Sequence, residues 1–115
     1  MPVDFTGTWR NQHNSTLELI VVGDIVSGRF ESGVGDDGQT LWVAVSGRVL
    51  GDLITFNAVY PRFGTLVAWV GQHTIESGVG MIKSHWLHAT NVDDPQEKAW
   101  MWASNRIGSD VFTRA

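Results

Sequence analysis

The 115-residue chain contains no cysteine, which excludes disulfides, thiolate nucleophiles and cysteine-ligated zinc. Basic residues are also few, because eight Lys and Arg stand against twelve Asp and Glu and give a net charge of −4. Nucleic-acid binding needs a surplus of basic side chains to neutralise phosphates, so no nucleic-acid partner is expected. The longest apolar runs have about five residues, far short of the ~20 that span a bilayer, so no membrane partner is expected either.

Hydrophobic residues are plentiful, at 43% of the chain, while only 17% of residues are charged, so the chain is expected to fold. Its length fits a single domain spanning residues 1–115. Thirteen glycines punctuate the sequence, and six of its aromatic residues are tryptophan. Tryptophan is large and carries an N–H that needs a partner. Its abundance in a short chain is therefore typical of a protein with an aromatic-lined binding site.

Short runs of alternating apolar and polar residues, separated by Gly, Asn and Asp, predict an all-β fold. The predicted strands cover residues 7–13, 16–22, 25–32, 41–47, 53–60, 66–75, 81–89, and a last strand through 100–104 and 110–114. Only residues 94–103 have the pattern of a helical turn. Tight links favour antiparallel hairpins in an up-and-down order, and eight such strands can close into a β-barrel. A barrel of this size has room for one small ligand.

Catalytic and cofactor motifs are weak in this sequence. Gly33–Gly38 fits a dinucleotide-binding glycine pattern, but a predicted strand follows it where the motif needs a helix. His85 and His88 are three residues apart on one predicted strand, so they point to opposite faces and cannot share a metal ion. No serine stands in a nucleophile elbow, so no enzyme is expected. Asp110 stands out beside apolar Val111, as either a surface charge or an acceptor for a ligand N–H.

Five segments form a series along nearly the whole chain: GTWRNQHNST at 7–16, SGRFESGVG at 27–35, VAWVGQ at 67–72, SHWL at 84–87, and Trp102 followed by RIGSDVFTR at 106–114. This series resembles the avidin and streptavidin family, whose members are eight-stranded antiparallel barrels that bind biotin at one open end. The resemblance implies a non-enzymatic biotin-binding protein that needs no cofactor and no metal.

The resemblance also implies roles for individual side chains. Asn11 and Ser15 would donate to the ureido oxygen of biotin, while Ser32 and Asp110 would accept from its two ureido N–H groups. The remaining roles concern the walls, the lid and the tail. Trp69 and Trp86 would form the walls around the thiophane ring, and Trp102 would cap the pocket of a neighbouring subunit. Residues 33–40, with Val34, would form a lid over the mouth. Thr65 and the backbone N–H of Asp36 would reach the ligand carboxylate.

The chain departs from the family pattern at several of these positions. Phe30 replaces a tyrosine that donates to the ureido oxygen, and the loss of one bond to a buried acceptor costs ~1–3 kcal/mol, or roughly 5- to 150-fold in affinity. The other departures are Tyr60 for a wall tryptophan, Val67 for a threonine near the sulfur, His13 and His88 on the walls, and Asp36, whose side chain would repel a ligand carboxylate. The resemblance therefore implies biotin binding weaker than in the strongest family members.

Two alternatives stay open: a lipocalin-like barrel for another small apolar ligand, and an interaction or structural module with a vestigial pocket. Self-association as a homodimer or homotetramer is expected from Trp102 and from outward apolar strand positions such as Ile54 and Ile82. The family resemblance implies secretion, but residues 1–4 have neither the basic nor the apolar segment of a signal peptide, so the compartment stays open.

Overall fold

The strands form where β-branched and aromatic residues alternate with polar ones. In Leu53–Tyr60, Ile54, Phe56 and Ala58 are buried, and the residues between them are exposed. Residues two apart in a strand point to the same face, so this pattern buries one face and leaves the other in solvent. The computed structural model describes residues 3–32 and 41–115, apart from the side chain of Trp102, and the same alternation recurs along the other long strands.

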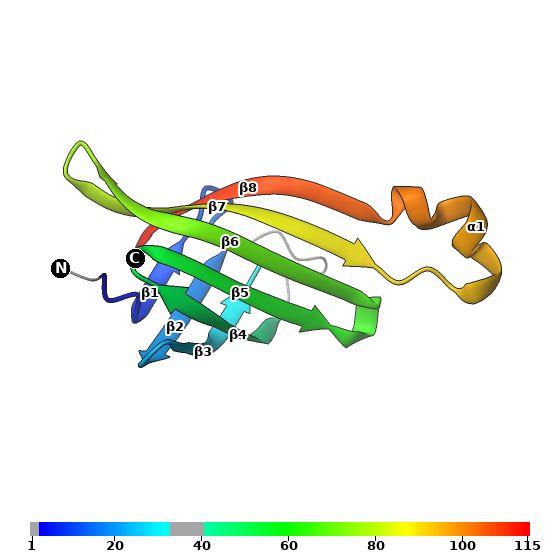
Figure 1. Cartoon of the computed structure of the whole chain (residues 1–115), viewed down its shortest axis with the longest axis horizontal. Helices are drawn as coiled ribbons and strands as arrows, with labels where there is room; N and C mark the ends of the chain where they lie inside the picture. Colours follow the sequence, from blue (N-terminus) through cyan, green and yellow to red (C-terminus); the bar gives the residue numbers. More distant parts are fainter. Residues whose placement is uncertain (1–2, 33–40) are drawn as a thin grey trace.

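Within the described residues, eight antiparallel strands close into a barrel in chain order, with the last strand paired to the first (Figure 1). They are β1 (Gly7–Arg10), β2 (Thr16–Val22), β3 (Ile25–Glu31), β4 (Trp42–Leu50), β5 (Leu53–Tyr60), β6 (Thr65–Glu76), β7 (Val79–Thr90) and β8 (Asn105–Arg114). The predicted eight-stranded, up-and-down antiparallel β-barrel is confirmed.

The connections between strands divide the barrel into two ends. One end, called the mouth, carries the β1–β2, β3–β4, β5–β6 and β7–β8 connections. The opposite end, called the base, carries the other three connections and both chain ends (Figure 1). There the backbone N–H of Ala115 donates to the carbonyl oxygen of Thr8 at 2.9 Å. Any site built from the first set of connections therefore opens away from the termini.

The predicted last strand was wrong between residues 100 and 104. That stretch is helical, with η3 (Asp94–Gln96), α1 (Glu97–Trp100) and η4 (Met101–Ala103) in succession. Pro95 fits the first turn of a helix, and the residues after it are good helix formers with no β-branched side chain among them. The helical turn expected at 94–103 is therefore present, and β8 runs unbroken from Asn105.

The first strand is shorter than predicted, because β1 ends at Arg10. The side-chain oxygen of Asn11 accepts hydrogen bonds from the backbone N–H groups of His13 at 3.0 Å and Ser15 at 2.9 Å. Asparagine commonly closes a turn in this way. Asn14 then adopts a positive φ of 62°, which reverses the chain into β2. His13 therefore lies exposed in a turn and not on a strand face.

The hydrophobic core fills the barrel toward the base. Trp9 is fully buried there, and its indole N–H donates to the carbonyl oxygen of Phe5 at 2.9 Å. Ile54 and Ile82 are 1% and 0% exposed, so the prediction that they face outward was wrong. Ile54 shares the inward phase of Phe56, and Ile82 shares that of Ser84, because period two keeps such residues on one face.

The β7–β8 hairpin extends well beyond the rest of the barrel at the mouth, with α1 at its far end (Figure 1). This extension gives the molecule its long axis of 51 Å against 31 and 27 Å for the other two. The one α-helix of the described residues has four residues, and no helix in that part of the chain could cross a bilayer.

Candidate ligand-binding site

A buried carboxylate lies inside the barrel between the base and the mouth. Asp110 on β8 is only 6% exposed. Its Oδ2 accepts a hydrogen bond from the indole N–H of Trp69 on β6 at 3.1 Å, and its Oδ1 accepts from the side chain of Gln12 at 3.1 Å. The backbone oxygen of Asp110 also accepts from the hydroxyl of Ser84 on β7 at 3.0 Å. Of the two sequence readings, the surface charge is therefore wrong: two donors hold the carboxylate inside, and a third holds the backbone of the same residue.

The side chain of Gln12 links the β1–β2 turn to β8 by hydrogen bonds. Its amide also donates to the carbonyl oxygen of Ser109 at 3.0 Å, and its side-chain oxygen accepts from the backbone N–H of Val111 at 2.9 Å. The direct pairing of β1 with β8 covers only two residue pairs, ending at Arg10 with Thr113. The Gln12 side chain therefore replaces backbone ladder bonds where the barrel closes, and it fixes the carboxylate of Asp110 at the same time.

Aromatic rings line the interior around this carboxylate. Trp69 stacks on Phe56 with ring centroids 4.9 Å apart, and it lies 5.1 Å from Phe30 at a tilt of 53°. Trp86 pairs in register with Trp69 and with Gly108 of β8, and its indole packs against that glycine. A Cβ at Gly108 would be 2.2 Å from Trp86 Cζ2, so only glycine allows this placement of the indole. The walls are thus apolar and shaped by close contacts.

Polar groups from the β1–β2 turn and from β3 reach the same end of the barrel. The Asn11 side-chain oxygen accepts two hydrogen bonds from backbone N–H groups, so the amide NH₂ is the part of this side chain that can donate elsewhere. Ser15 is 3% exposed. Ser32 follows Glu31, the register partner of Thr16, so it lies beside Ser15. The mouth therefore gathers short polar side chains next to the aromatic wall.

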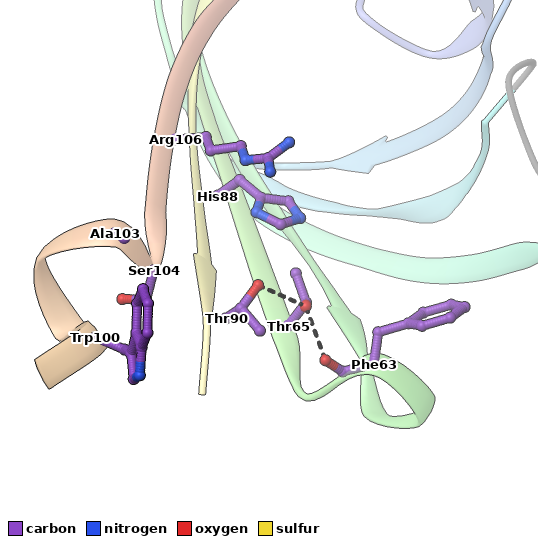
Figure 2. A pocket seen from close by; sticks show the side chains of 8 residues that line it. All are labelled: Phe63, Thr65, His88, Thr90, Trp100, Ala103, Ser104 and Arg106. Atoms are coloured by element: carbon purple, nitrogen blue, oxygen red, sulfur yellow. Dashed lines mark hydrogen bonds between the residues drawn. The ribbon is translucent and has the colours of Figure 1, made fainter. Parts of the chain in front are cut away.

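A pocket of about 730 Å³ opens at the mouth beside the β7–β8 hairpin (Figure 2). It is lined by Phe63, Thr65, His88, Thr90, Trp100, Ala103, Ser104 and Arg106. The Thr65 hydroxyl lies 3.1 Å from that of Thr90 and donates to the carbonyl oxygen of Phe63 at 3.1 Å. Phe63 belongs to the short η2 turn (Pro61–Phe63) between β5 and β6.

The other residues singled out in the sequence are placed as follows. Val67 is buried, and Tyr60 is half-buried at the mouth end of β5. Burial raises the pKa of the Tyr60 hydroxyl above its ordinary value. Val34 and Asp36 lie outside the described residues, as does the proposed lid at 33–40, and so does the side chain of Trp102 on η4.

In the described part of the chain, no group of three or more His, Asp or Glu side chains is placed to hold a metal ion. The opposite orientation predicted for His85 and His88 fits their burial, because His85 is exposed and His88 is half-buried beside the pocket. What the interior offers is a set of hydrogen-bonding groups within aromatic walls, which suits reversible binding of a small ligand with a polar head.

Sequence reasoning missed three residues of this site: Gln12, Phe56 and Arg106. Gln12 gave no signal, because its contact with Asp110 exists only once the barrel closes. Phe56 was assigned to a strand, but its stacking on Trp69 depends on the register of β5 with β6. Arg106 could have been found from its period-two spacing with Gly108 and Asp110 on the inner face of β8.

The sequence pattern of the avidin family matches residues 1–115. The chain belongs to the avidin family. Members of this family are non-enzymatic binding proteins, so this avidin-family chain is not an enzyme. The expected resemblance is thereby confirmed over the whole chain.

Several solved structures share the barrel fold of this chain. The crystal structure of Xenavidin matches with a TM-score of 0.84 at 19% identity, covering 100% of both chains. A biotin-binding protein from chicken matches with a TM-score of 0.82 at 23% identity, covering 99% of this chain and 98% of that one. A rhizavidin–biotin complex matches with a TM-score of 0.77 at 21% identity, covering 98% and 97%. No curated protein matches the sequence.

Proposed function

We propose that this avidin-family barrel binds biotin, with the ureido head against Asp110 and the acidic tail toward the mouth. The observation that carries the proposal is the buried carboxylate of Asp110, oriented by Trp69 and Gln12 and surrounded by aromatic rings. Each carboxylate oxygen can accept two hydrogen bonds, and the protein supplies one side-chain donor to each. Asp110 therefore keeps the capacity to accept a ureido N–H.

The remaining polar groups fit the rest of the ureido head. The amide NH₂ of Asn11 is positioned to donate, because the oxygen of that side chain is already engaged by the turn. In this proposal Asn11 and Ser15 donate to the ureido oxygen, and Ser32 accepts from the second ureido N–H. Phe30 is buried at 6% exposure and contributes a ring without a hydroxyl. The ureido oxygen therefore receives two hydrogen bonds, which favours moderate over extreme affinity.

The ligand body and tail would occupy the aromatic and mouth regions. Trp69 and Trp86 would flank the thiophane ring, with Val67 near the sulfur and Tyr60 completing the wall. Thr65 would lie near the carboxylate together with His88. Three further assignments complete the proposal: His13 at the rim, Val34 and Asp36 in the lid, and Trp102 over a neighbouring subunit.

We further propose that the barrels self-associate through the outward faces of β6, β7 and β8. Leu66, Val70, Leu87 and Ile107 are 58%, 60%, 48% and 79% exposed. Leu87 pairs in register with Ile107 and with Ala68, so these side chains form a continuous apolar surface across three strands. Contiguous apolar surface of this kind is typical of a protein–protein interface.

Titration with biotin, followed by calorimetry and by melting temperature, tests the proposal. A ligand that binds only the folded state raises the free energy of unfolding, by about 2.7 kcal/mol at a concentration one hundred times Kd.

Asp110→Asn should weaken binding at least tenfold, because an amide NH₂ cannot accept from a ureido N–H. Asp52→Asn in the β4–β5 turn at the base is the matched control. An unchanged melting temperature in millimolar biotin would contradict the proposal.

A further inference from the structure

Two basic side chains stand together at the mouth. His88 on β7 and Arg106 on β8 are register partners, and both line the pocket. Figure 2 shows them extending to the same side of the hairpin, above the Thr65 and Thr90 hydroxyls. Their strands are held by adjacent ladder bonds, so their positions relative to each other are fixed by the backbone.

Neither side chain has a partner among the described residues. Nδ1 of His88 is buried without a hydrogen bond. The ion pairs of the described residues are Arg29 with Glu18, Arg48 with Asp24 and Lys83 with Glu76, so the guanidinium of Arg106 takes part in none of them. No described carboxylate lines the pocket. A buried polar atom without a partner costs stability, and a ligand acceptor at this position would relieve that cost.

The hydroxyls of the pocket cannot supply the donors that an anion needs. The Thr65 proton goes to the carbonyl oxygen of Phe63, so in its 3.1 Å contact with Thr90 it is the Thr90 hydroxyl that donates. Both protons are therefore engaged inside the protein. The hydroxyl of Ser104 is engaged as well, because it donates to the carbonyl oxygen of Met101 at 2.8 Å. The side-chain donors of the lining that remain for an incoming group are the guanidinium of Arg106, the imidazole of His88 and the indole N–H of Trp100, and of these only Arg106 and His88 are register partners.

We propose that His88 and Arg106 form an anion subsite at the mouth, which selects ligands whose tail ends in a free carboxylate over neutral or amide-linked forms. The inference rests on the proposed function and names the specificity of the same site. Guanidinium and carboxylate match in shape and bond in pairs. The overall charge of −4 repels anions, and the guanidinium of Arg106 would offset that repulsion at the entrance.

Paired titrations with biotin and its methyl ester test the subsite. The wild-type protein should bind the acid roughly 3- to 20-fold more tightly than the ester, since Arg106 is exposed to solvent and its pairing is partly screened. Arg106→Gln should weaken binding of the acid alone and bring the two ligands within about twofold of each other. His88→Leu should lower the preference in the same direction. Added salt should reduce the wild-type preference, because screening acts only on the charged ligand.

Arg62→Gln is the control, because Arg62 is also at the mouth, on η2, but does not line the pocket. It should leave the preference for the acid intact. Equal wild-type affinity for acid and ester would overturn the anion subsite and leave biotin binding standing. Equal weakening of both ligands by Arg106→Gln would also overturn it. If neither ligand binds the wild-type protein, the proposed function fails, and the subsite fails with it.

Discussion

The Phe30 ring occupies a buried position on the inner face of β3, 5.1 Å from the ring of Trp69. In the proposed complex, a hydroxyl on this ring would add a donor to the wall that faces biotin. Phe30→Tyr should tighten biotin binding roughly 5- to 150-fold, because it adds one hydrogen bond to a buried acceptor. Calorimetric titration of the two proteins against biotin measures the difference.

Val22→Thr is the control for this change, since it also adds a hydroxyl, but at a residue that is 73% exposed at the base end of β2 and does not line the pocket. It should alter the affinity by less than about twofold. An unchanged or weaker constant for Phe30→Tyr would contradict the placement of Phe30 beside the ureido oxygen.

Tyr60 provides a second test at the residue scale. Burial raises the pKa of its hydroxyl above the ordinary value of about 10. The folded state therefore keeps the proton over a pH range in which the unfolded state has lost it. The free energy of unfolding should be unaffected below about pH 10 and should fall as the pH rises through the folded-state pKa.

Tyr60 is the only tyrosine of the chain, so the near-ultraviolet absorbance of the phenolate reports this group alone. The folded protein should titrate above pH 10, and the protein in denaturant should titrate near 10. Tyr60→Phe should lose that part of the alkaline destabilisation. A folded-state titration at the ordinary value would show that the ring is more solvated than the structure places it.

At the scale of strands, the site depends on how closely β7 and β8 approach. Trp86 lies over Gly108, and a Cβ there would come within 2.2 Å of the indole. Gly108→Ala should displace the indole, weaken biotin binding by about tenfold or more, and cost ~1–3 kcal/mol of stability through overpacking. Tryptophan fluorescence, calorimetry and thermal melting measure these three effects.

Ser109→Ala, on the exposed face of the same strand, is the control and should change none of these quantities appreciably. Trp86→Phe in the Gly108→Ala background should recover part of the lost stability, because a smaller ring leaves room for the methyl group. Full stability in Gly108→Ala alone would refute the close contact.

The elements also show what the sequence could and could not reveal. The existence of the strands followed from period-two alternation, because one buried face forces that pattern. The alternation did not by itself say which face is inside, so Ile54 and Ile82 were assigned to the wrong side. The bounds failed where local chemistry overrides alternation: at Asn11, whose side chain closes a turn, and at residues 97–103, whose composition favours a helix. The Gln12–Asp110 contact spans 98 residues and exists only in the closed barrel, so no local pattern encodes it.

For the whole molecule, the question is how barrels associate. In this proposal Trp102 reaches a neighbouring subunit, so Trp102→Ala should speed biotin release and weaken association together. Ile107→Glu, which places a charge on the most exposed apolar residue of β8, should weaken association by itself. Sedimentation and stopped-flow release measure the two effects. Loss of neither property in Trp102→Ala would show that this residue does not act between subunits.

The position of the chain ends has a practical consequence for the assembled fold. Ala115 is hydrogen-bonded to Thr8 at the base, on the side away from the mouth. A short linker could therefore join the two ends, and new ends could be cut in the exposed β6–β7 turn at Ser77 and Gly78. Such a circular permutant would keep every pair of neighbouring strands. A protein fused at the new ends would lie at the base of the barrel and would leave the mouth unobstructed.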